Sequence, residues 1–274
     1  MLIDTHAHLN FSAFKDDADE TVKRASDKDV WIINVGSQYS TSERAVLMAE
    51  KYQEGVFAAI GIHPIHLSEL IFKDKVDDDE EVEFHPSMEE FDEKRYIELA
   101  KSKKVVAIGE IGLDYFHNKE NKEKQKEVFS AQIDMAMKLD LPIVIHCREA
   151  YNDVIEILRD KKIKYGEKLR GVVHCFSGRL TQAKIYTEEL GFHLGFNGII
   201  TFDRSYDKVV REIDLKHILI ETDCPYLTPV PFRGKRNEPV YVKYVAEKIA
   251  EIKGIDLAKI EKITTENARR LFRI

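Results

Sequence analysis

The chain has 274 residues and carries 42 Lys and Arg against 49 Asp and Glu, a formal net charge of −7 with histidine neutral. This length suits one large α/β domain, and no apolar run approaches the ~20 residues that a membrane-spanning helix needs. The negative charge argues against binding nucleic acid through a broad basic surface but leaves room for a local basic rim. Cys147, Cys175 and Cys224 are odd in number and scattered, which favours reduced thiols in a cytoplasmic protein.

Short, apolar, β-branched runs alternate with longer segments of helical periodicity. The predicted strands occupy residues 2–3, 30–35, 56–60, 105–108, 143–145, 172–173, 192–196 and 218–220, and helical patterns between them include residues 41–51, 122–139 and 151–161. This rhythm indicates parallel βαβ units. Eight such units in a chain of this length predict a (β/α)8 TIM barrel that forms a single domain over residues 1–274.

The main structural alternative is a doubly wound open sheet, but no Gly-rich phosphate loop follows the first predicted strand. The longest spacing between strands separates the third from the fourth, and its excess lies at about residues 66–95. We interpret this stretch as an acidic loop insertion on the catalytic side of the barrel. Its run of five acidic residues, 77–81, is typical of a solvated surface segment.

The first predicted strand leads into the segment IDTHAH at residues 3–8. Side chains two residues apart lie on the same face of a strand, so His6 and His8 can converge on one metal ion. For this pair alone, a metal site and an ordinary pair of core or surface histidines are both open. The other strand ends must supply further ligands before a metal site is favoured.

Ligand-type residues do stand where four other predicted strands end, the part of a barrel that carries its chemistry. They are Glu110 after the fourth strand, His146 after the fifth, His174 after the sixth and Asp223 after the eighth. Each alone has a structural explanation, such as a buried histidine bonded to backbone, a capping aspartate or a salt-bridged carboxylate. Six such residues at one end of one barrel favour a shared metal site.

Several segments resemble the motifs of the TatD-type metal-dependent deoxyribonucleases. They are DTHAHL (residues 4–9), GIHP (61–64), GEIGLDY (109–115), HCRE (146–149), HCFSG (174–178), ETDCPYL (221–227), RGKRNEP (233–239) and the closing TENARRLF (265–272). The resemblance covers essentially the whole chain, although the stretch at residues 66–95 looks longer than the usual family loop. It implies an amidohydrolase-like barrel that holds two divalent metal ions.

The metal ligands that the resemblance implies by position are His6, His8 and Asp223 for one ion, His146 and His174 for the other, and Glu110 as the bridge. Many related barrels use a carboxylated lysine as the bridge. No lysine stands at the tip of this strand, which favours the nuclease branch over hydrolases of cyclic amides. The donor set of four histidines and two carboxylates suits Zn²⁺, Mn²⁺ or Fe²⁺, whereas the resemblance implies Mg²⁺.

Asp223 is our candidate for the general base that takes a proton from the attacking water, in addition to its role as a ligand. Glu110 is the second candidate catalytic residue. His63 resembles the substrate-side histidine of the family and is the third, with an expected contact to phosphate. Glu221 either orients a ligand histidine or is a purely structural inward carboxylate.

Three arginines are candidate phosphate contacts. Arg148 follows a ligand histidine closely, but an ion pair with Glu149 or Glu110 is the alternative. Arg233 and Arg236 lie in a Pro- and Gly-punctuated loop after the last strand, where Glu238 is a competing partner. In the same region, Tyr226 and Phe232 either stack on a base or pack within the protein.

The sequence therefore predicts a metal-dependent deoxyribonuclease that acts on single-stranded ends of DNA through a metal-activated water. Its expected substrate is DNA, with no membrane and no obligate protein partner. A barrel hydrolase of a small amide, ester or lactone is the main alternative, but a neutral amide needs no arginine clamp. A non-catalytic metal-binding or scaffold protein is the third, and the full set of six ligands argues against it.

Overall fold

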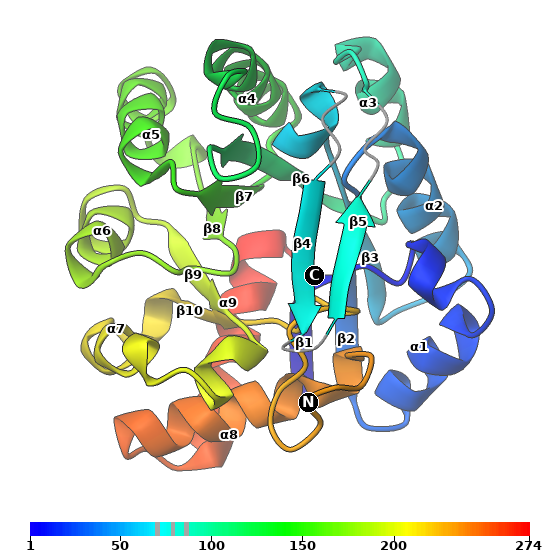
Figure 1. Cartoon of the computed structure of the whole chain (residues 1–274), viewed down its shortest axis with the longest axis vertical. Coiled ribbons are helices and arrows are strands. Elements are labelled where there is room, and N and C mark those ends of the chain that lie inside the picture. Colours follow the sequence, from blue (N-terminus) through cyan, green and yellow to red (C-terminus); the bar gives the residue numbers. More distant parts are fainter. Residues whose placement is uncertain (69–71, 78–79, 85–87) are drawn as a thin grey trace.

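The computed structural model describes residues 1–68, 72–77, 80–84 and 88–274. Eight parallel strands form one sheet, and Figure 1 shows helices arranged around it. In sheet order the strands are β1 (Leu2–Ala7), β2 (Val30–Val35), β3 (Val56–Ile60), β6 (Val105–Asp114), β7 (Ile143–Arg148), β8 (Gly171–Val173), β9 (His193–Phe196) and β10 (Ile218–Ile220). All eight predicted strands are confirmed, and together they form the predicted barrel rather than a doubly wound sheet.

The helices of the described residues alternate with these strands. They are α1 (Ala18–Ser26), α2 (Tyr39–Glu50), α3 (Glu93–Leu99), α4 (Lys122–Leu139), α5 (Tyr151–Tyr165), α6 (Leu180–Lys184), α7 (Asp207–Glu212), α8 (Val242–Lys253) and α9 (Leu257–Phe272). Short helical segments are η1 (Ser12–Phe14), η2 (Pro64–Leu67), η3 (Gly166–Lys168), η4 (Ile185–Glu189), η5 (Gly198–Thr201), η6 (Arg204–Tyr206), η7 (Leu215–His217) and η8 (Pro239–Tyr241). The buried residues of α4 show why it forms, since Val128, Phe129, Ile133 and Met137 recur on one helical face.

The sheet is nearly closed by contacts between β1 and the residues that follow β10. Ala7 forms a parallel bridge with Cys224. The Asp223 N–H donates to the His6 carbonyl at 2.8 Å, and the His8 N–H donates to the Cys224 carbonyl at 2.9 Å. Closure therefore takes place at the carboxyl ends of the strands, and it holds Asp223 beside His6 and His8.

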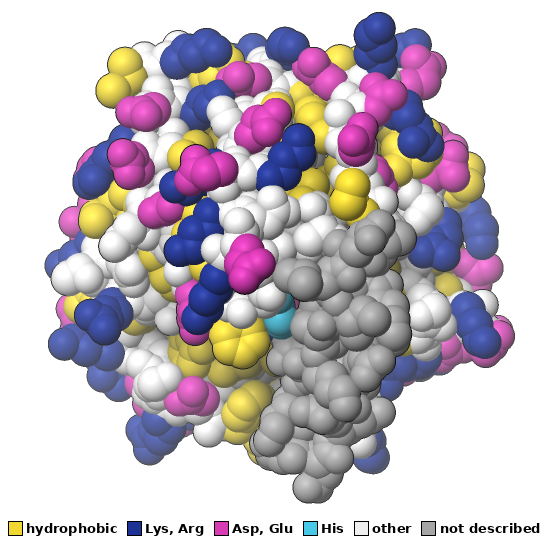
Figure 2. Space-filling view, turned by 45° about the horizontal axis from the view of Figure 1, so that its top comes forward, with side chains coloured by type: hydrophobic (Ala, Val, Ile, Leu, Met, Phe, Trp, Pro, Cys, Tyr) yellow, Lys and Arg dark blue, Asp and Glu magenta, His cyan; other side chains and the backbone are white. Residues whose placement is uncertain are grey.

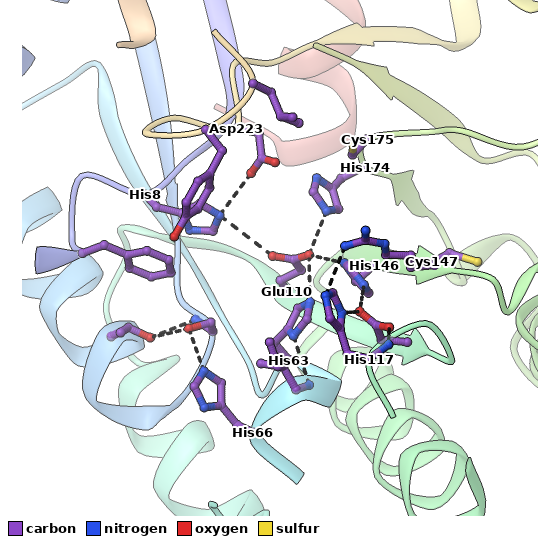
Figure 3. Close-up of a pocket in the computed structure, with 18 of the residues that line it drawn as sticks. His8, His63, His66, Glu110, His117, His146, Cys147, His174, Cys175 and Asp223 are labelled. Atoms are coloured by element: carbon purple, nitrogen blue, oxygen red, sulfur yellow. Dashed lines mark hydrogen bonds and ion pairs between the residues drawn. The ribbon is translucent and has the colours of Figure 1, made fainter. Parts of the chain in front are cut away.

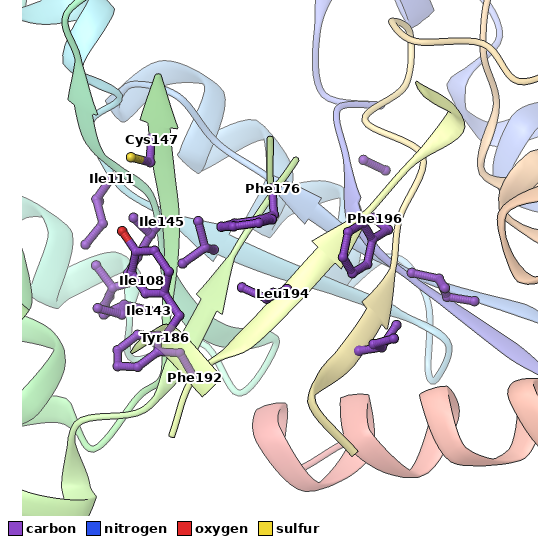
Figure 4. Packing of buried hydrophobic residues seen from close by; sticks show 14 of the residues in the cluster. Ile108, Ile111, Ile143, Ile145, Cys147, Phe176, Tyr186, Phe192, Leu194 and Phe196 are labelled. Atoms are coloured by element: carbon purple, nitrogen blue, oxygen red, sulfur yellow. The ribbon is translucent and has the colours of Figure 1, made fainter. Parts of the chain in front are cut away.

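Alternate strand residues build two hydrophobic clusters. The larger one joins outward-facing residues, such as Ile143, Ile145 and Cys147 of β7, to the surrounding helices, and Figure 4 shows part of this packing. The smaller one joins the intervening residues, such as Val144, to Leu271 of α9. Because neighbouring strand residues point to opposite faces, the smaller cluster fills the barrel interior, with α9 across the amino ends of the strands.

The expected acidic loop at residues 66–95 is in part a β-hairpin. Strands β4 (Phe72–Asp77) and β5 (Glu80–Phe84) pair antiparallel in a separate two-stranded sheet, drawn in cyan in Figure 1. Their register sets Lys73 opposite Glu83 and Lys75 opposite Glu81, so residues of opposite charge alternate with others along the hairpin. Neither of these two strands has two adjacent apolar residues, because charged residues dominate both, and adjacent apolar residues were the signal on which the strand predictions depended.

Candidate metal centre

The inward-facing positions change from apolar to polar at the carboxyl end of the barrel. On β7, Val144 belongs to the interior cluster and His146 is the next residue with the same orientation. His174 likewise stands two residues after Val172 of β8, and Glu221 stands two residues after Leu219 of β10; Val172 and Leu219 also belong to the interior cluster. A polar layer therefore lies directly on the apolar interior, as the alternation of strand side chains requires.

Glu110 lies at the centre of this layer, with histidines on both sides (Figure 3). Its Oε1 lies 2.7 Å from His174 Nε2 and 2.8 Å from His146 Nδ1. Its Oε2 lies 3.3 Å from His6 Nε2 and 4.0 Å from His8 Nε2. The two oxygens of one carboxylate thus face two separate pairs of histidines.

Asp223 completes the side formed by His6 and His8. Its Oδ1 lies 3.3 Å from His8 Nε2 and 3.7 Å from His6 Nε2. The residue has a φ of 59°, a left-handed conformation that aspartate tolerates better than most residues. The His8 Nδ1–H donates to the Val35 carbonyl at 2.8 Å, so the lone pair of His8 is on Nε2 and points at the site.

Glu221 supports the opposite side of the site from within the barrel. It is fully buried, and its Oε1 lies 3.4 Å from His174 Nδ1 while accepting the Cys175 N–H at 2.6 Å. Gly195 of β9 leaves the space for it, because a Cβ at that position would collide with the Glu221 carboxylate. A carboxylate beside the outer nitrogen of a histidine keeps the inner nitrogen available as a ligand.

The charges of this cluster compensate one another. Burial alone would raise the pKa of Glu110, but His174, His63 and His146 outweigh it and hold the pKa well below its usual value. Burial likewise opposes protonation of His174, yet Glu110 and Glu221 raise its pKa well above the usual value. Burial and the charge of His174 lower the pKa of His6. The cluster therefore combines ionised carboxylates with strongly basic and weakly basic nitrogens.

This donor set fits divalent cations. Three overlapping groups have ligand atoms within 4.8 Å of one another: His6, His8 and Glu110; His63, Glu110 and His146; and His6, His174 and Glu221. Imidazole nitrogens and carboxylate oxygens are the ligands of zinc, manganese and iron sites, and carboxylates also bind magnesium. All six predicted metal ligands lie in this one cluster.

His63 is also brought to the site. It follows β3 as the N-cap of η2, where its Nδ1 accepts the Ile65 N–H at 3.1 Å. Its Nε2 lies 3.5 Å from Glu110 Oε1. Burial and the charge of His146 lower the pKa of His63 well below its usual value, so this histidine is neutral at physiological pH.

Asp114 and His117 belong to the site but were not predicted as site residues. The Asp114 Oδ2 lies 2.7 Å from His117 Nδ1 and 3.1 Å from His146 Nε2. Asp114 stands four residues after Glu110 in β6, so the even spacing along a strand was a signal that could have found it. His117 lies in the following loop, where its proximity to Asp114 depends on a turn that no strand pattern specifies.

The three predicted phosphate-binding arginines have different positions. Arg148, the last residue of β7, lines the pocket above the site, and its Nη1 lies 3.3 Å from His117 Nε2. Arg233 and Arg236 are not among the described residues that line this pocket. Arg236 instead forms an ion pair with Asp17 and donates to the Ala13 carbonyl at 2.7 Å. The prediction that Arg236 contacts phosphate therefore has no support in this geometry.

The pocket above the site has a volume of about 680 Å³. Six histidines, Glu110, Asp114 and Asp223 are among its lining residues, together with Phe11 and Tyr226. Figure 2 shows a histidine at the molecular surface, next to exposed hydrophobic side chains. Phe232, by contrast, stacks on Tyr241 with ring centroids 4.6 Å apart, so it packs within the protein.

None of the helices in the described residues is long and apolar enough to span a membrane.

Comparison with known proteins agrees with the sequence motifs. A family model described as "TatD related DNase" matches residues 3–273. An uncharacterized metal-dependent hydrolase of Bacillus subtilis, YabD, is 46% identical over 277 residues, which cover 100% of both chains. A Pectobacterium parmentieri protein named "3'-5' ssDNA/RNA exonuclease TatD" is 32% identical over 281 residues and also covers both chains fully. The crystal structure of YjjV, a TatD homolog from Escherichia coli, is 28% identical and superposes with a TM-score of 0.85 over 100% of this chain and 98% of the other.

Proposed function

Because the chain belongs to the TatD-related DNase family, we propose that it is a metal-dependent phosphodiesterase that removes nucleotides from single-stranded ends of DNA. The coarser class, a metal-dependent hydrolase, is shared with its relatives. The observation that carries the finer proposal is the position of Glu110, whose two oxygens face two separate pairs of histidines. This is the arrangement that a carboxylate bridge between two cations requires.

We assign His6, His8 and Asp223 to one cation and His146 and His174 to the other, with Glu110 between them. Two bound divalent cations, with Mg²⁺, Mn²⁺ and Zn²⁺ as the candidates, would neutralise the phosphodiester and lower the pKa of the attacking water. The Val35 carbonyl contacts Nδ1 of His8, and the Glu221 carboxylate contacts Nδ1 of His174. These contacts orient the two imidazole rings before any ligand binds.

The chain's own groups then have distinct tasks. Asp223 is assigned to take the proton of the attacking water. Burial alone would raise its pKa, but His8 and His174 lower it, so the carboxylate is ionised at neutral pH and has an oxygen available to accept a proton. His63 is neutral, and because its Nδ1 accepts the Ile65 N–H, its Nε2–H can donate a hydrogen bond to a phosphate oxygen without adding charge. Arg148 lines the pocket and supplies the positive charge that an anionic substrate needs.

The substrate is assigned from the pocket and from the relatives. A volume of about 680 Å³ is within the ~300–1,000 Å³ range of ligand pockets, and it suits the terminal unit of a strand better than a duplex. The Pectobacterium relative carries an exonuclease name, which supports processing from an end. No lysine occurs in β6, so the carboxylated lysine bridge of many amide hydrolases has no counterpart on this strand.

The test is a substrate panel with the full chain after chelation. Labelled single-stranded DNA, duplex DNA, RNA, amides and lactones are incubated with Mg²⁺, Mn²⁺ or Zn²⁺ restored one at a time. We expect stepwise shortening of single-stranded DNA, and the label position reports the polarity. A Glu110→Gln variant purified in parallel excludes a contaminating nuclease, because it retains the shape of the side chain but not its charge. Turnover of an amide or lactone with no cleavage of any phosphodiester rejects the proposal.

A further inference from the structure

Two exposed phenylalanine rings at the carboxyl end of the barrel each carry an arginine. Phe116 is 46% exposed and Phe202 is 42% exposed, and they are the aromatic members of the large exposed hydrophobic side chains in the described residues. The Arg148 Cζ lies 3.9 Å from the centroid of Phe116, and the Arg233 Cζ lies 4.1 Å from that of Phe202. We refer to these as the Phe116–Arg148 pair and the Phe202–Arg233 pair.

The Phe116–Arg148 pair lies on the rim of the pocket. Phe116 stands two residues after the end of β6 and is followed by His117, which lines the pocket. Arg148 lines the pocket itself and is held there by its contact with His117. The guanidinium therefore faces the site, while the ring next to it is exposed outside the pocket.

The Phe202–Arg233 pair lies on another part of the same rim, separated from the first by β8 in the sheet order. Phe202 follows η5, and its N–H donates at 3.1 Å to the carbonyl of Ile199, a lining residue. Arg233 donates to the Thr228 carbonyl at 3.2 Å, and its loop also contributes Tyr226 and Leu227 to the pocket. The first pair thus includes a residue that lines the pocket, and the second pair adjoins residues that line it.

An exposed ring sets these two pairs apart from ordinary surface contacts. Cation–π contacts occur about once per 70–80 residues in proteins, and others are present here. In two of them, however, the cation covers a buried or half-buried ring: Arg236 lies over Phe14, and Arg95 lies over Tyr39. Phe116 and Phe202, by contrast, are exposed in addition to their contact with an arginine, so each offers apolar surface that a further planar group can cover.

Single-stranded DNA has the matching chemistry, since flat bases alternate with anionic phosphates along its backbone. Unpaired bases stack on aromatic side chains, and this contact is tolerant of sequence. The arginine of each pair adds a positive charge at the position where the neighbouring phosphate must lie. The local charge is favourable even though the whole chain carries −7.

We propose that the Phe116–Arg148 and Phe202–Arg233 pairs are two base-stacking platforms that hold unpaired nucleotides of the strand whose end occupies the pocket. This inference rests on the proposed function and names the single-strand contacts of the same site. The ring of each platform binds a base of the strand and not the scissile phosphate. Loss of either ring, with its arginine retained, therefore weakens binding of an oligonucleotide and leaves hydrolysis of a small phosphodiester unchanged.

The test compares an oligonucleotide with a small diester, bis(p-nitrophenyl) phosphate, in the metal-loaded full chain. Phe116→Ala and Phe202→Ala are expected to raise KM for single-stranded DNA by about fivefold or more, as loss of a stacked base does. Hydrolysis of the small diester stays within about twofold of the wild-type rate. Phe116→Tyr and Phe202→Tyr retain the ring and restore the wild-type KM. Ile163→Ala is the matched control, because Ile163 is 86% exposed near the far end of α5.

A second arm removes the base instead of the ring. An oligonucleotide with abasic residues near the processed end retains its phosphates, so wild type and the alanine variants should bind it equally. An unchanged KM for the intact oligonucleotide in both alanine variants overturns the platforms while leaving the proposed function in place. Failure of the wild-type chain to hydrolyse either phosphodiester overturns the proposed function and the platforms together.

Discussion

His193, at the amino end of the barrel, makes folding stability depend on pH independently of the metal site. It is the first residue of β9, is 9% exposed, and its ring centroid lies 5.9 Å from that of His217. Burial, followed by the charges of His217 and Arg270, lowers the pKa of His193 to about 4. In the unfolded chain a histidine titrates near 6.5, so the unfolded state takes up the proton first as the pH falls.

The size of the effect follows from these two values. Because the pKa of His193 is lower in the folded state than in the unfolded chain, this residue contributes folding stability above pH 6.5. That contribution is lost as the pH falls through about 4. With 1.36 kcal/mol per pKa unit, the full loss of folding stability is about 3 kcal/mol. Between pH 7 and pH 5, linkage gives a loss of about 2 kcal/mol from this residue. That is a large share of a typical stability of about 5–15 kcal/mol.

The perturbation is His193→Gln, and the assay is urea unfolding at pH 7 and pH 5 with chelator present throughout. Glutamine does not titrate, so the variant should lose about 2 kcal/mol less stability than wild type over this interval, whatever offset the substitution causes at pH 7. The histidines distant from His193 titrate in both proteins and cancel in the comparison, whereas His217 interacts with His193 and is tested by its own variant. The matched control is His217→Gln, for which we expect a smaller effect because His217 is only partly buried. Equal losses in wild type and His193→Gln would refute the reasoning.

Three further predictions concern the site and its loop. Glu110→Gln should reduce bound metal, measured by elemental analysis after dialysis, and lower phosphodiesterase activity more than about 100-fold, because it removes the one group that faces both histidine pairs. Full metal content would contradict the shared bridge. Glu221→Gln should weaken metal affinity by about 10–100-fold in a competition titration, since it removes the charge beside His174; unchanged affinity would make Glu221 purely structural. Arg236→Ala should leave KM for single-stranded DNA within about twofold and cost at most about 1 kcal/mol in thermal unfolding, because its partner is Asp17; a large rise in KM would restore Arg236 as a phosphate contact.

The barrel and its metal ligands were predictable because they depend on short-range patterns. Apolar runs at regular spacing located the eight strands, and residues at their ends were expected to meet. The structure brings Glu110, His146 and His174 together as that reasoning requires.

Other features depend on contacts that sequence patterns do not specify. The hairpin β4–β5 has opposite charges across its strands instead of an apolar run. The direction of a long arginine side chain is set by partners distant in sequence, as when Asp17 binds Arg236 across 219 positions. Arg148, by contrast, ends a strand whose orientation was already known, and it does line the pocket. Predictions for side chains at strand ends were therefore stronger than those for side chains in loops.

The two ends of the barrel show that burial alone does not decide the charge of an inward-facing residue. His193 and Glu110 are both buried, and burial opposes the charged form of each. At the amino end, His193 faces His217 and Arg270, so burial and neighbours act together and the imidazole stays neutral. At the carboxyl end, histidines surround Glu110 and outweigh burial, so the carboxylate stays ionised. In the part of the chain that the structure describes, Glu110 at the carboxyl end is therefore a buried anion among nitrogen donors, whereas His193 at the amino end is a neutral base, which is why a cation is expected at the carboxyl end.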